Sequence, residues 1–284
     1  EFRRVLFRSD FILAKDGTPK ILEFNADTPT SLLEASVIQW QWKEDVFPEC
    51  DQFNGIHEGL VQSWKDIFPK KGEIYFAGAL ENNEDTGTLQ YLASTAMEAG
   101  FSTRVLDMQA LDLQNGRFFD PAGELVNRCF KLYPWEWMVD ESPDGCLAEM
   151  EWLEPIWKLV MSNKAILATL YELFPDSPYV LPCYLSRPRS GLFCKKPVFS
   201  REGHNVSVVD IRNWEEHVRI AETEGDYNTG AYVYQEYVEP TVYSGRYPVI
   251  GSWIIGGEAA GIGIRENRME VTDNLSEFVP HIIG

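Results

Sequence analysis

The sequence predicts a mixed protein of the α+β and α/β classes, on the basis of three local patterns. Residues 10–25 form a hairpin pattern, because Asp16-Gly17 separates two apolar runs. Residues 73–106 alternate apolar strand, helix and apolar strand, which is typical of a β-α-β unit. Residues 249–264 form two apolar runs around a Gly-Gly pair, which predicts a second hairpin.

The bulk composition excludes several classes of protein. The chain has 284 residues, of which 44% are hydrophobic, and a formal net charge of −19. The hydrophobic content supports a substantial core, and no apolar run is long enough to span a membrane. The negative charge argues against nonspecific nucleic-acid binding, which needs a basic surface. The cysteines form no CxxC pair and are expected to be reduced thiols of a cytoplasmic protein: Cys50, Cys129, Cys146, Cys183 and Cys194.

The turn at Asp16-Gly17 predicts a register for the first hairpin. A two-residue turn would place Lys15 opposite Thr18, Ile12 opposite Ile21, and Asp10 opposite Glu23. Asn25 would then lie opposite position 8 on the same face, because side chains alternate along a strand.

Asp10, Glu23 and Asn25 are therefore expected on one face of this hairpin. Two directly opposed carboxylates repel each other, and an oxygen-preferring cation between them reverses that cost. The arrangement predicts a Mg²⁺ site, with Asn25 as the third oxygen ligand. An exposed hairpin face with solvated charges is the alternative, and this segment alone does not decide between them.

A helix is expected next, from Ser31 to about Val46. Ser31 and Glu34 have the spacing of a capping box. The N-terminus of this helix follows the predicted metal strand, and free N–H groups and the helix dipole favour an anion there. Thr28 and Thr30 would add hydroxyl donors, although an ordinary helix cap explains the same pattern.

The β-α-β unit consists of a strand at 73–80, a helix at 85–99 and a strand at 101–106. Ligands gather at the carboxyl ends of strands in such units. That position holds a polar cluster, which comprises Glu81, Asn82, Asn83, Glu84 and Asp85. These acids would bind an amino group of a substrate, or they cap the helix and face solvent.

The next two segments have a less specific pattern. Residues 131–137 are rich in aromatic side chains and form either a wedge beside a cleft or part of the core. A helix that begins at Glu154 is expected to carry Lys164.

A hairpin with a polar tip is expected after this helix. Strands at 192–199 and 206–209 flank the loop 200–205, which contains Gly, Arg and free N–H groups. Such a tip suits a mobile cover over phosphates. A further strand is expected at 232–238.

Five motifs follow one another in order along the chain. They are LEFNADTPTS at 22–31, SNK at 162–164, KPVFSREG at 196–203, QEY at 235–237 and GIGIRE at 261–266. Together they resemble the glutathionylspermidine synthase family, and more closely its shorter bacterial members, the acid–amine ligases that lack the amidase domain. The resemblance covers nearly the whole chain from Asp10 onward, and the collinear set is specific although each motif alone is not.

The resemblance implies a permuted ATP-grasp fold with an associated pre-ATP-grasp-like β-α-β domain. In the permuted order of the chain, the metal-binding residues precede the nucleotide-binding lysines. The implied division gives residues 1–70 the metal-binding hairpin and helix. Residues 71–150 form the substrate-side β-α-β domain, and residues 151–284 form the nucleotide-binding part with the phosphate-covering hairpin.

The resemblance also implies roles for individual residues. Mg²⁺ would be bound by Asp10, Glu23 and Asn25, in agreement with the hairpin register. ATP would be bound by Lys164, Lys196, Glu202 of the covering loop, Gln235, Glu236 and Tyr237. Arg8, Arg201 and Arg265 match active-site arginines, although Ser9 replaces the aromatic residue that usually follows the first of them. The substrate would contact Thr28, Thr30, Glu84 and Asp85.

The implied activity is an ATP-dependent ligase that joins a small carboxylate to an amine through an acyl phosphate. The acid would be glutathione or another peptide, and the amine a polyamine. Two alternatives stay open: an ATP-grasp phosphotransferase, and a non-catalytic acidic module that binds polyamine or metal. The chain opens without Met, so we expect a truncated or artificially joined N-terminus. The family's N-terminal synthase segment is not in this sequence, and if it is missing from the protein, part of the fold is missing too and the truncated chain can be inactive.

Overall fold

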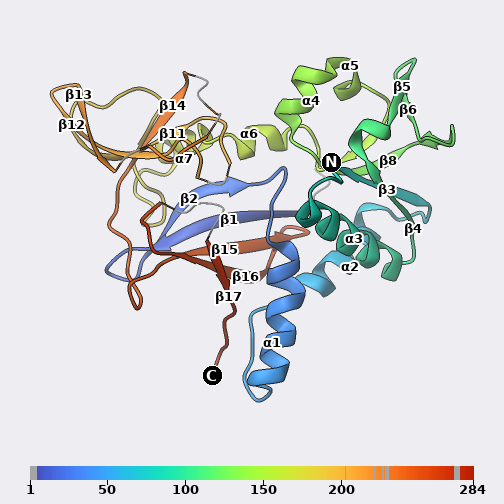
Figure 1. The fold of residues 1–284 in the computed structure, drawn as a ribbon, viewed down its shortest axis with the longest axis horizontal. Helices are drawn as coiled ribbons and strands as arrows, with labels where there is room; N and C mark the ends of the chain where they lie inside the picture. Colours follow the sequence, from blue (N-terminus) through green and yellow to red (C-terminus); the bar gives the residue numbers. More distant parts are fainter. Residues whose placement is uncertain (1–4, 202, 221, 226, 228–229, 272–275) are drawn as a thin grey trace.

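The structure is a computed structural model that describes residues 5–201, 203–220, 222–225, 227, 230–271 and 276–284 (Figure 1). Its helices are α1 (Gln39–Val46), α2 (Ile56–Ile67), α3 (Asn83–Glu98), α4 (Trp135–Glu141), α5 (Pro143–Cys146), α6 (Lys158–Ser162) and α7 (Ile166–Leu173), with a π-helical turn η1 (Glu34–Ile38) and a 3₁₀ turn η2 (Met108–Ala110). Its strands are β1 (Leu6–Leu13), β2 (Pro19–Asn25), β3 (Glu73–Gly78), β4 (Ser102–Asp107), β5 (Asp112–Gln114), β6 (Arg117–Phe119), β7 (Leu125–Val126), β8 (Arg128–Leu132), β9 (Glu151–Leu153), β10 (Cys183–Tyr184), β11 (Gly191–Pro197), β12 (Ser207–Arg212), β13 (Glu215–Ile220), β14 (Tyr232–Glu236), β15 (Tyr247–Ile255), β16 (Glu258–Asn267) and β17 (Glu277–Val279).

Within these residues the strands form four sheets. The first sheet has the order β17-β16-β15-β1-β2 and joins the start of the chain to its end. The second sheet has the order β10-β14-β11-β12-β13, and both of these sheets are antiparallel. The parallel sheet has the order β4-β3-β8-β9, and the small sheet has the order β5-β6-β7. Figure 1 shows the first sheet below the second, with the parallel sheet to their right.

The predicted β-α-β unit is confirmed. Strand β3 pairs in parallel with β4 after helix α3, and β8 pairs on the other edge of β3. The rings of Trp64, Phe76 and Phe130 pack together in the core that α2 shares with this sheet, with centroids 5.6 to 6.3 Å apart. Parallel strands are buried on both faces, which explains the continuous apolar run of β3.

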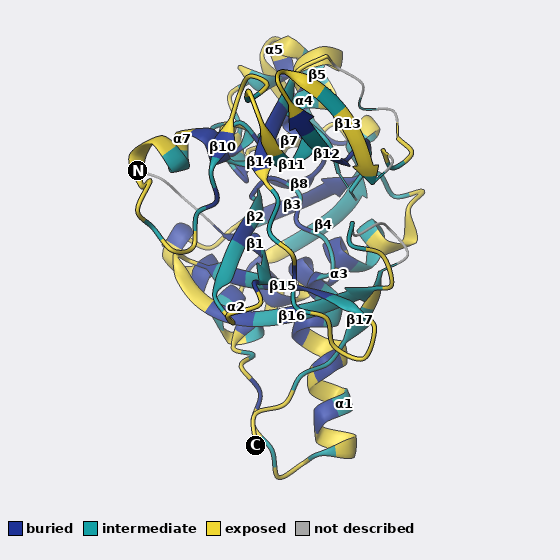
Figure 2. Cartoon of the chain, turned by 90° about the vertical axis from the view of Figure 1, so that its left-hand side faces the viewer, coloured by how far each residue is buried: buried dark blue, intermediate teal, exposed yellow. Residues whose placement is uncertain are grey.

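The other predicted strands also form. Strands β15 and β16 make the C-terminal hairpin, β11 and β12 make the hairpin with the polar tip, and β14 pairs with β11. Figure 2 shows dark, buried strands at the centre of the molecule, while α1 and the edge strand β13 carry mostly exposed residues. No helix among the described residues has the length and apolar character needed to cross a lipid bilayer.

The first hairpin forms with a different turn from the one predicted. Ala14 pairs with Thr18 around a three-residue loop, in which Gly17 has a φ of +83° and donates its N–H to the Ala14 carbonyl. This loop shifts the register by one residue, so Ile12 lies opposite Lys20 instead of Ile21. A bulge at Asp10/Phe11 shifts the register back. The predicted pairing of Asp10 with Glu23 is therefore confirmed, as is that of position 8 with Asn25.

The predicted first helix forms, but its predicted cap does not. Ser31 has a φ of +63°, whereas an N-cap residue has extended backbone, and the turn η1 begins without a side-chain cap. A π-helical turn then leads into α1. The capping-box prediction at Ser31 and Glu34 is wrong, because the chain reverses sharply at Ser31 instead of entering the helix in an extended conformation.

Lys164 lies between two short helices, and the prediction of one continuous helix is wrong at this point. Helix α6 ends at Ser162, and Asn163 is extended, with φ −76° and ψ 123°. The Asn163 side chain accepts the Ala165 N–H at 2.8 Å and so competes with helix continuation. The break aims Lys164 at the first hairpin.

The aromatic segment 131–137 was predicted to form either part of the core or a wedge beside a cleft, and its two tryptophans differ in burial. Trp135 is buried in the core, whereas Trp137 is 41% exposed. The division of the chain at residues 70 and 150 stays a prediction. The strands that precede residue 70 and those that follow residue 246 belong to one sheet, so the outer two segments fold together.

Candidate active site

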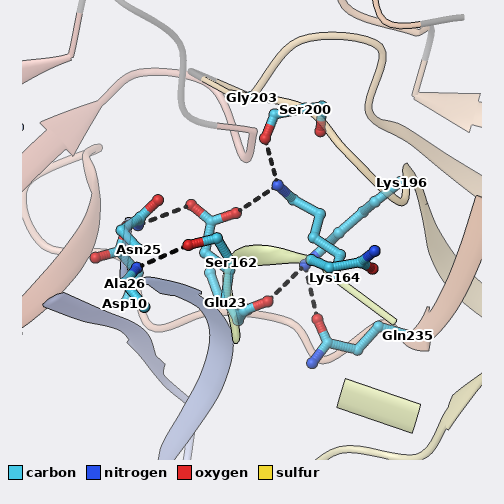
Figure 3. A network of polar contacts seen from close by, with 12 residues as sticks. Asp10, Glu23, Asn25, Ala26, Ser162, Lys164, Lys196, Ser200, Gly203 and Gln235 are labelled. Carbon is cyan, nitrogen blue, oxygen red and sulfur yellow. Dashed lines mark hydrogen bonds and ion pairs between the residues drawn. The ribbon is translucent and has the colours of Figure 1, made fainter. Parts of the chain in front are cut away.

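Most of the residues predicted to bind nucleotide and metal line one pocket between the first and second sheets, and Asn25 lies beside it. Among the described residues that line it are Asp10, Glu23, Lys164, Lys196, Gln235, Glu236 and Tyr237. The rest of its wall is largely apolar and includes Leu181, Val206, Val238 and Val271. Figure 3 shows the polar end, where groups from β1, β2, β11, β14 and the α6–α7 break meet. The pocket thus combines a charged end with a wall that is largely apolar.

The two carboxylates and the amide predicted to bind metal lie on one face of the first hairpin. The Asn25 amide donates Nδ2 to Asp10 Oδ2 at 3.2 Å and to Glu23 Oε1 at 3.3 Å. This juxtaposition follows from the register, because Asp10 pairs with Glu23, and Glu23 and Asn25 are two positions apart on β2. The alternative of a solvated hairpin face is wrong, because Asp10 is only 2% exposed.

Two arginines bind Asp10. Arg8 donates to both of its oxygens, with Nε at 2.6 Å and Nη2 at 3.0 Å, and donates Nη1 to the Thr30 carbonyl. Arg265 donates Nη2 to the same carboxylate at 2.7 Å. Gly251 lies opposite Asp10 on β15, and a Cβ there would lie 2.7 Å from Arg8 Cδ. The absence of a side chain at Gly251 therefore makes room for Arg8, which is 4% exposed.

Two lysines approach the hairpin from the other side. Lys164 forms an ion pair with Glu23 at 3.0 Å and donates Nζ to the Ser200 carbonyl at 2.6 Å. Lys196 donates Nζ to the Gln235 amide oxygen at 2.7 Å and to the Leu22 carbonyl at 3.2 Å. Leu22 lies at the bulge, where carbonyl groups leave the strand ladder. The bulge thus restores the register and also presents an acceptor to Lys196.

The charges of this cluster act strongly on one another. Burial by itself raises the pKa of Glu23, but Lys164 and Lys196 outweigh that effect and lower the pKa to about 2. Burial lowers the pKa of Lys196, and the charge of Lys164 lowers it further. The charge of Arg8, followed by burial, lowers the pKa of Arg265. Cations crowd one another at this end of the pocket, which favours a multiply charged anion.

The donor set at Asp10, Glu23 and Asn25 has the chemistry of a hard-cation site. Carboxylate and amide oxygens are the ligands that Mg²⁺ takes in proteins. The described residues contain no group of three or more His, Cys, Asp or Glu side chains placed for a metal ion. The set Asp10, Glu23 and Asn25 differs from such a group because its third member is an amide. Asn25 directs its Nδ2 at both carboxylates here, and a cation would need the opposite amide orientation.

The loop that follows β11 contributes Arg201. Its guanidinium donates to Thr28 Oγ1 and to Glu136 Oε1, so it bridges the segment after β2 and the first turn of α4. Gly203 of the same loop lines the pocket. Glu202, which was predicted to bind nucleotide, lies outside the described residues. Sequence reasoning missed Glu136, although it lies in the aromatic motif that suggested a wedge beside a cleft.

The other end of the pocket is formed by β14 and the segment that follows β16. Gln235 donates Nε2 to the Ile21 carbonyl at 2.8 Å, while its oxygen accepts from Lys196. Both ends of this side chain are therefore committed to protein groups. Tyr237 donates its hydroxyl to Glu270 at 2.6 Å, and Glu270 also lines the pocket. No sequence signal marked Glu270, because its role depends on the approach of β14.

The residues predicted to bind substrate lie around this site and outside the pocket itself. Thr28 contacts Arg201, and Thr30 contacts Arg8 through its carbonyl. Glu84 and Asp85 lie in the first turn of α3. Burial by itself lowers the pKa of Arg8, but Asp10 and, more weakly, Glu23 and Glu84 raise it above its ordinary value. The charge of the first turn of α3 therefore acts on the arginine and carboxylate cluster.

A buried ion pair fixes the segment that carries Thr28. Asp27 accepts Lys131 Nζ at 2.6 Å and the Trp135 N–H at 2.7 Å, and both charged side chains are fully buried. The backbone N–H of Asp27 donates to Ser162 Oγ at 2.9 Å. This ion pair was not predicted. The available signal in the sequence was Lys131, a charged residue within the largely apolar strand β8.

Comparison with proteins of known sequence places the chain among amide-forming synthetases. A Haemophilus influenzae protein named "Putative acid–amine ligase" is 38% identical over 276 residues, which cover 92% of this chain and 70% of that protein. Trypanothione synthetase of Crithidia fasciculata is 28% identical, and the bifunctional glutathionylspermidine synthetase/amidase of Escherichia coli is 26% identical. Their alignments cover 92% and 97% of this chain, but only 44% and 49% of those two proteins.

Comparison with solved structures supports the fold. A glutathione synthetase-like effector from Globodera pallida superposes with a TM-score of 0.63 at 11% identity, covering 100% of this chain and 78% of that one. The family model described as glutathionylspermidine synthase preATP-grasp matches residues 2–284. With that match and the 38% identical relative, the chain belongs to the glutathionylspermidine synthase family.

Proposed function

We propose that the protein is an ATP-dependent carboxylate–amine ligase that forms an amide bond through an acyl phosphate. The observation that supports this most directly is the charge of the pocket. At its hairpin end, Arg8, Arg265, Lys164 and Lys196 lie around the carboxylates of Asp10 and Glu23, in a chain whose net charge is −19, while Glu236 and Glu270 line other parts of the pocket. A local excess of cations in an acidic protein favours a polyphosphate.

We also propose that the two antiparallel sheets form a permuted ATP-grasp site, with Asp10, Glu23 and Asn25 as Mg²⁺ ligands. The order of the chain supports this, because the metal residues lie in β1 and β2 and the lysines follow in the last half. Adenine would lie against the apolar wall, beside Glu236 and Tyr237. Residues 71–150 would form the substrate-side domain.

The reaction would use charge neutralisation more than a protein nucleophile. A carboxylate oxygen of the acid bonds to the γ-phosphorus of ATP, and the bond to the β-phosphate oxygen breaks to release ADP. The amine nitrogen then bonds to the acyl carbon, phosphate leaves, and the amine loses one proton. Bound Mg²⁺ would neutralise phosphate charge during the transfer.

The chain's own residues would hold the reacting groups. Lys164 and Lys196 would bind the phosphates, and Arg201 and Arg265 would stabilise the charge on the transferring group. Arg8 would be fixed by Asp10, Thr30 and the gap at Gly251. These roles rest on the contacts described above and on the family resemblance.

We propose a small peptide acid, such as glutathione, and a polyamine as the substrates. The names of the relatives, which include trypanothione and glutathionylspermidine synthetases, support this choice. Thr28, Thr30, Glu84 and Asp85 would contact the acid or the amine. The free cysteines suit a reducing compartment, so we propose that the reaction occurs in the cytoplasm.

The experiment that tests the function is an assay of ADP release with Mg²⁺ over a panel of peptide acids and polyamines, with mass analysis of the products. ADP release that needs both an acid and an amine, with an amide product, is the expected result. A phosphorylated product formed without an amine would favour the phosphotransferase. Polyamine or Mg²⁺ binding without any nucleotide binding would favour the non-catalytic module.

A further inference from the structure

Arg201 is held by protein groups on one side only. Its terminal nitrogens donate to Thr28 and Glu136, and the guanidinium lies 6.0 Å from the centroid of the Trp137 ring. Its Nε is buried and has no hydrogen-bond partner among the described residues. A buried N–H without an acceptor is costly. Thr28 and Glu136 are therefore the acceptors, within the described part of the chain, that hold this guanidinium.

A second unsatisfied group belongs to the preceding residue of the chain. The hydroxyl of Ser200, the preceding residue, is also buried and has no partner among the described residues. The Ser200 carbonyl already accepts Lys164 Nζ, so this part of the loop is fixed to the phosphate-binding lysine. The Ser200 carbonyl and the Arg201 guanidinium thus both tie this loop to neighbouring segments.

Glu136 is itself rigidly placed. It occupies the first turn of α4, whose first N–H is accepted by the buried Asp27. Asp27 is in turn bound to Lys131, and its own N–H donates to Ser162. A chain of buried contacts thus fixes Glu136 relative to the segment that also carries Thr28. The side chains of Glu136 and Arg201 are 19% and 27% exposed, so solvent screens their pairing only in part.

We propose that Glu136 is a positioning residue for Arg201. It holds the guanidinium of Arg201 through a terminal nitrogen and so fixes the position of this side chain for phosphoryl transfer. This role rests on the proposed function, because it assumes that an oxyanion approaches Arg201. Displacement of a catalytic group by about 1 Å lowers a rate by about 100-fold, so a fixed guanidinium has a large effect.

The test compares Glu136→Ala, Glu136→Gln and the matched control Glu141→Gln in the full chain. Glu141 lies at the end of the same helix and accepts from Tyr133 instead of from the loop. Glu136→Ala should lower kcat by about 10- to 100-fold, with a smaller change in the KM for ATP. Glu136→Gln keeps an acceptor oxygen for Arg201 and should recover kcat to within about 10-fold of wild type.

Hydrogen exchange of peptides that cover residues 198–206 gives a second readout without nucleotide. Exchange should rise in Glu136→Ala and stay near wild type in Glu136→Gln and Glu141→Gln. A carboxylate that only stabilises the helix N-terminus would lose the same stability in both Glu136 variants, with kcat unchanged. That result, or exchange in Glu136→Ala equal to the control, would overturn the proposal. Failure of the proposed function would instead appear as wild-type protein that forms no ADP, and the exchange comparison would still decide whether Glu136 holds Arg201.

Discussion

Glu23 and Lys164 form an ion pair of 3.0 Å that joins strand β2 to the break between α6 and α7. The pair exists because Asn163 interrupts the helix and a bulge near Leu22 turns Glu23 toward Asp10. Lys164 also binds the backbone of the loop that carries Arg201. One lysine thus connects the carboxylate cluster and the loop that carries Arg201.

The lowered pKa of Glu23 predicts a pH-dependent stability. The contribution of Glu23 is fully present above its ordinary pKa of 4.5 and is lost as the pH falls toward about 2. Its size is up to about 3 kcal/mol. Glu23→Gln does not titrate, so its free energy of unfolding should approach that of wild type as the pH falls from about 5 to about 3. Urea unfolding followed by tryptophan fluorescence measures both curves, and a difference independent of pH would contradict the prediction.

Lys196 should be far more important for activity than its neighbour Lys195. The two side chains point to opposite faces of β11, and Lys195 pairs with Glu216 on the face away from the pocket. Lys196→Ala should lower kcat/KM for ATP by about 100-fold or more, because it removes a charge from the phosphate end. Lys195→Ala should change it less than about 3-fold. Equal losses of ADP release in the two variants would place the nucleotide elsewhere.

Gly251→Ala should displace Arg8. The added Cβ would lie 2.7 Å from Arg8 Cδ, and the buried arginine has little room to move. We expect a loss of about 1–3 kcal/mol in stability from overpacking and a fall of about 10-fold or more in kcat. Gly87→Ala is the matched control. Gly87 lies within helix α3, and a Cβ at this position would meet only Leu33, at 3.9 Å. The control should be stabilised by about 0.5–1 kcal/mol, and unchanged activity in Gly251→Ala would argue against a role for Arg8.

Asp27→Asn should destabilise the protein by about 3–5 kcal/mol, because it leaves Lys131 buried without its counter-charge. Burial already lowers the pKa of Lys131, and Asp27 opposes that effect. Addition of Lys131→Met should restore part of the lost stability, since the double variant buries no unpaired charge. Thermal unfolding of the two single variants and the double variant completes the cycle, and strictly additive losses would show that the pair is not coupled.

Much of the strand order could be predicted from the sequence. Short apolar runs separated by Gly-containing turns determine β3, β11, β15 and their partners, because hairpins and β-α-β units depend on local sequence. The pairing of Asp10 with Glu23 across the hairpin was also predictable, although the prediction assumed a two-residue turn and no bulge. The turn and the bulge each shift the register by one residue, and the two shifts cancel.

The sequence by itself determined the local elements and the chemical character of the site, since residue type and spacing carry that information. Only the tertiary structure decided which distant groups meet. Arg265 reaches Asp10, Glu270 meets Tyr237, and Glu136 holds Arg201 through contacts between segments far apart in the chain. Such contacts depend on how sheets pack and where a helix breaks, and no local periodicity encodes the distance between two sheets.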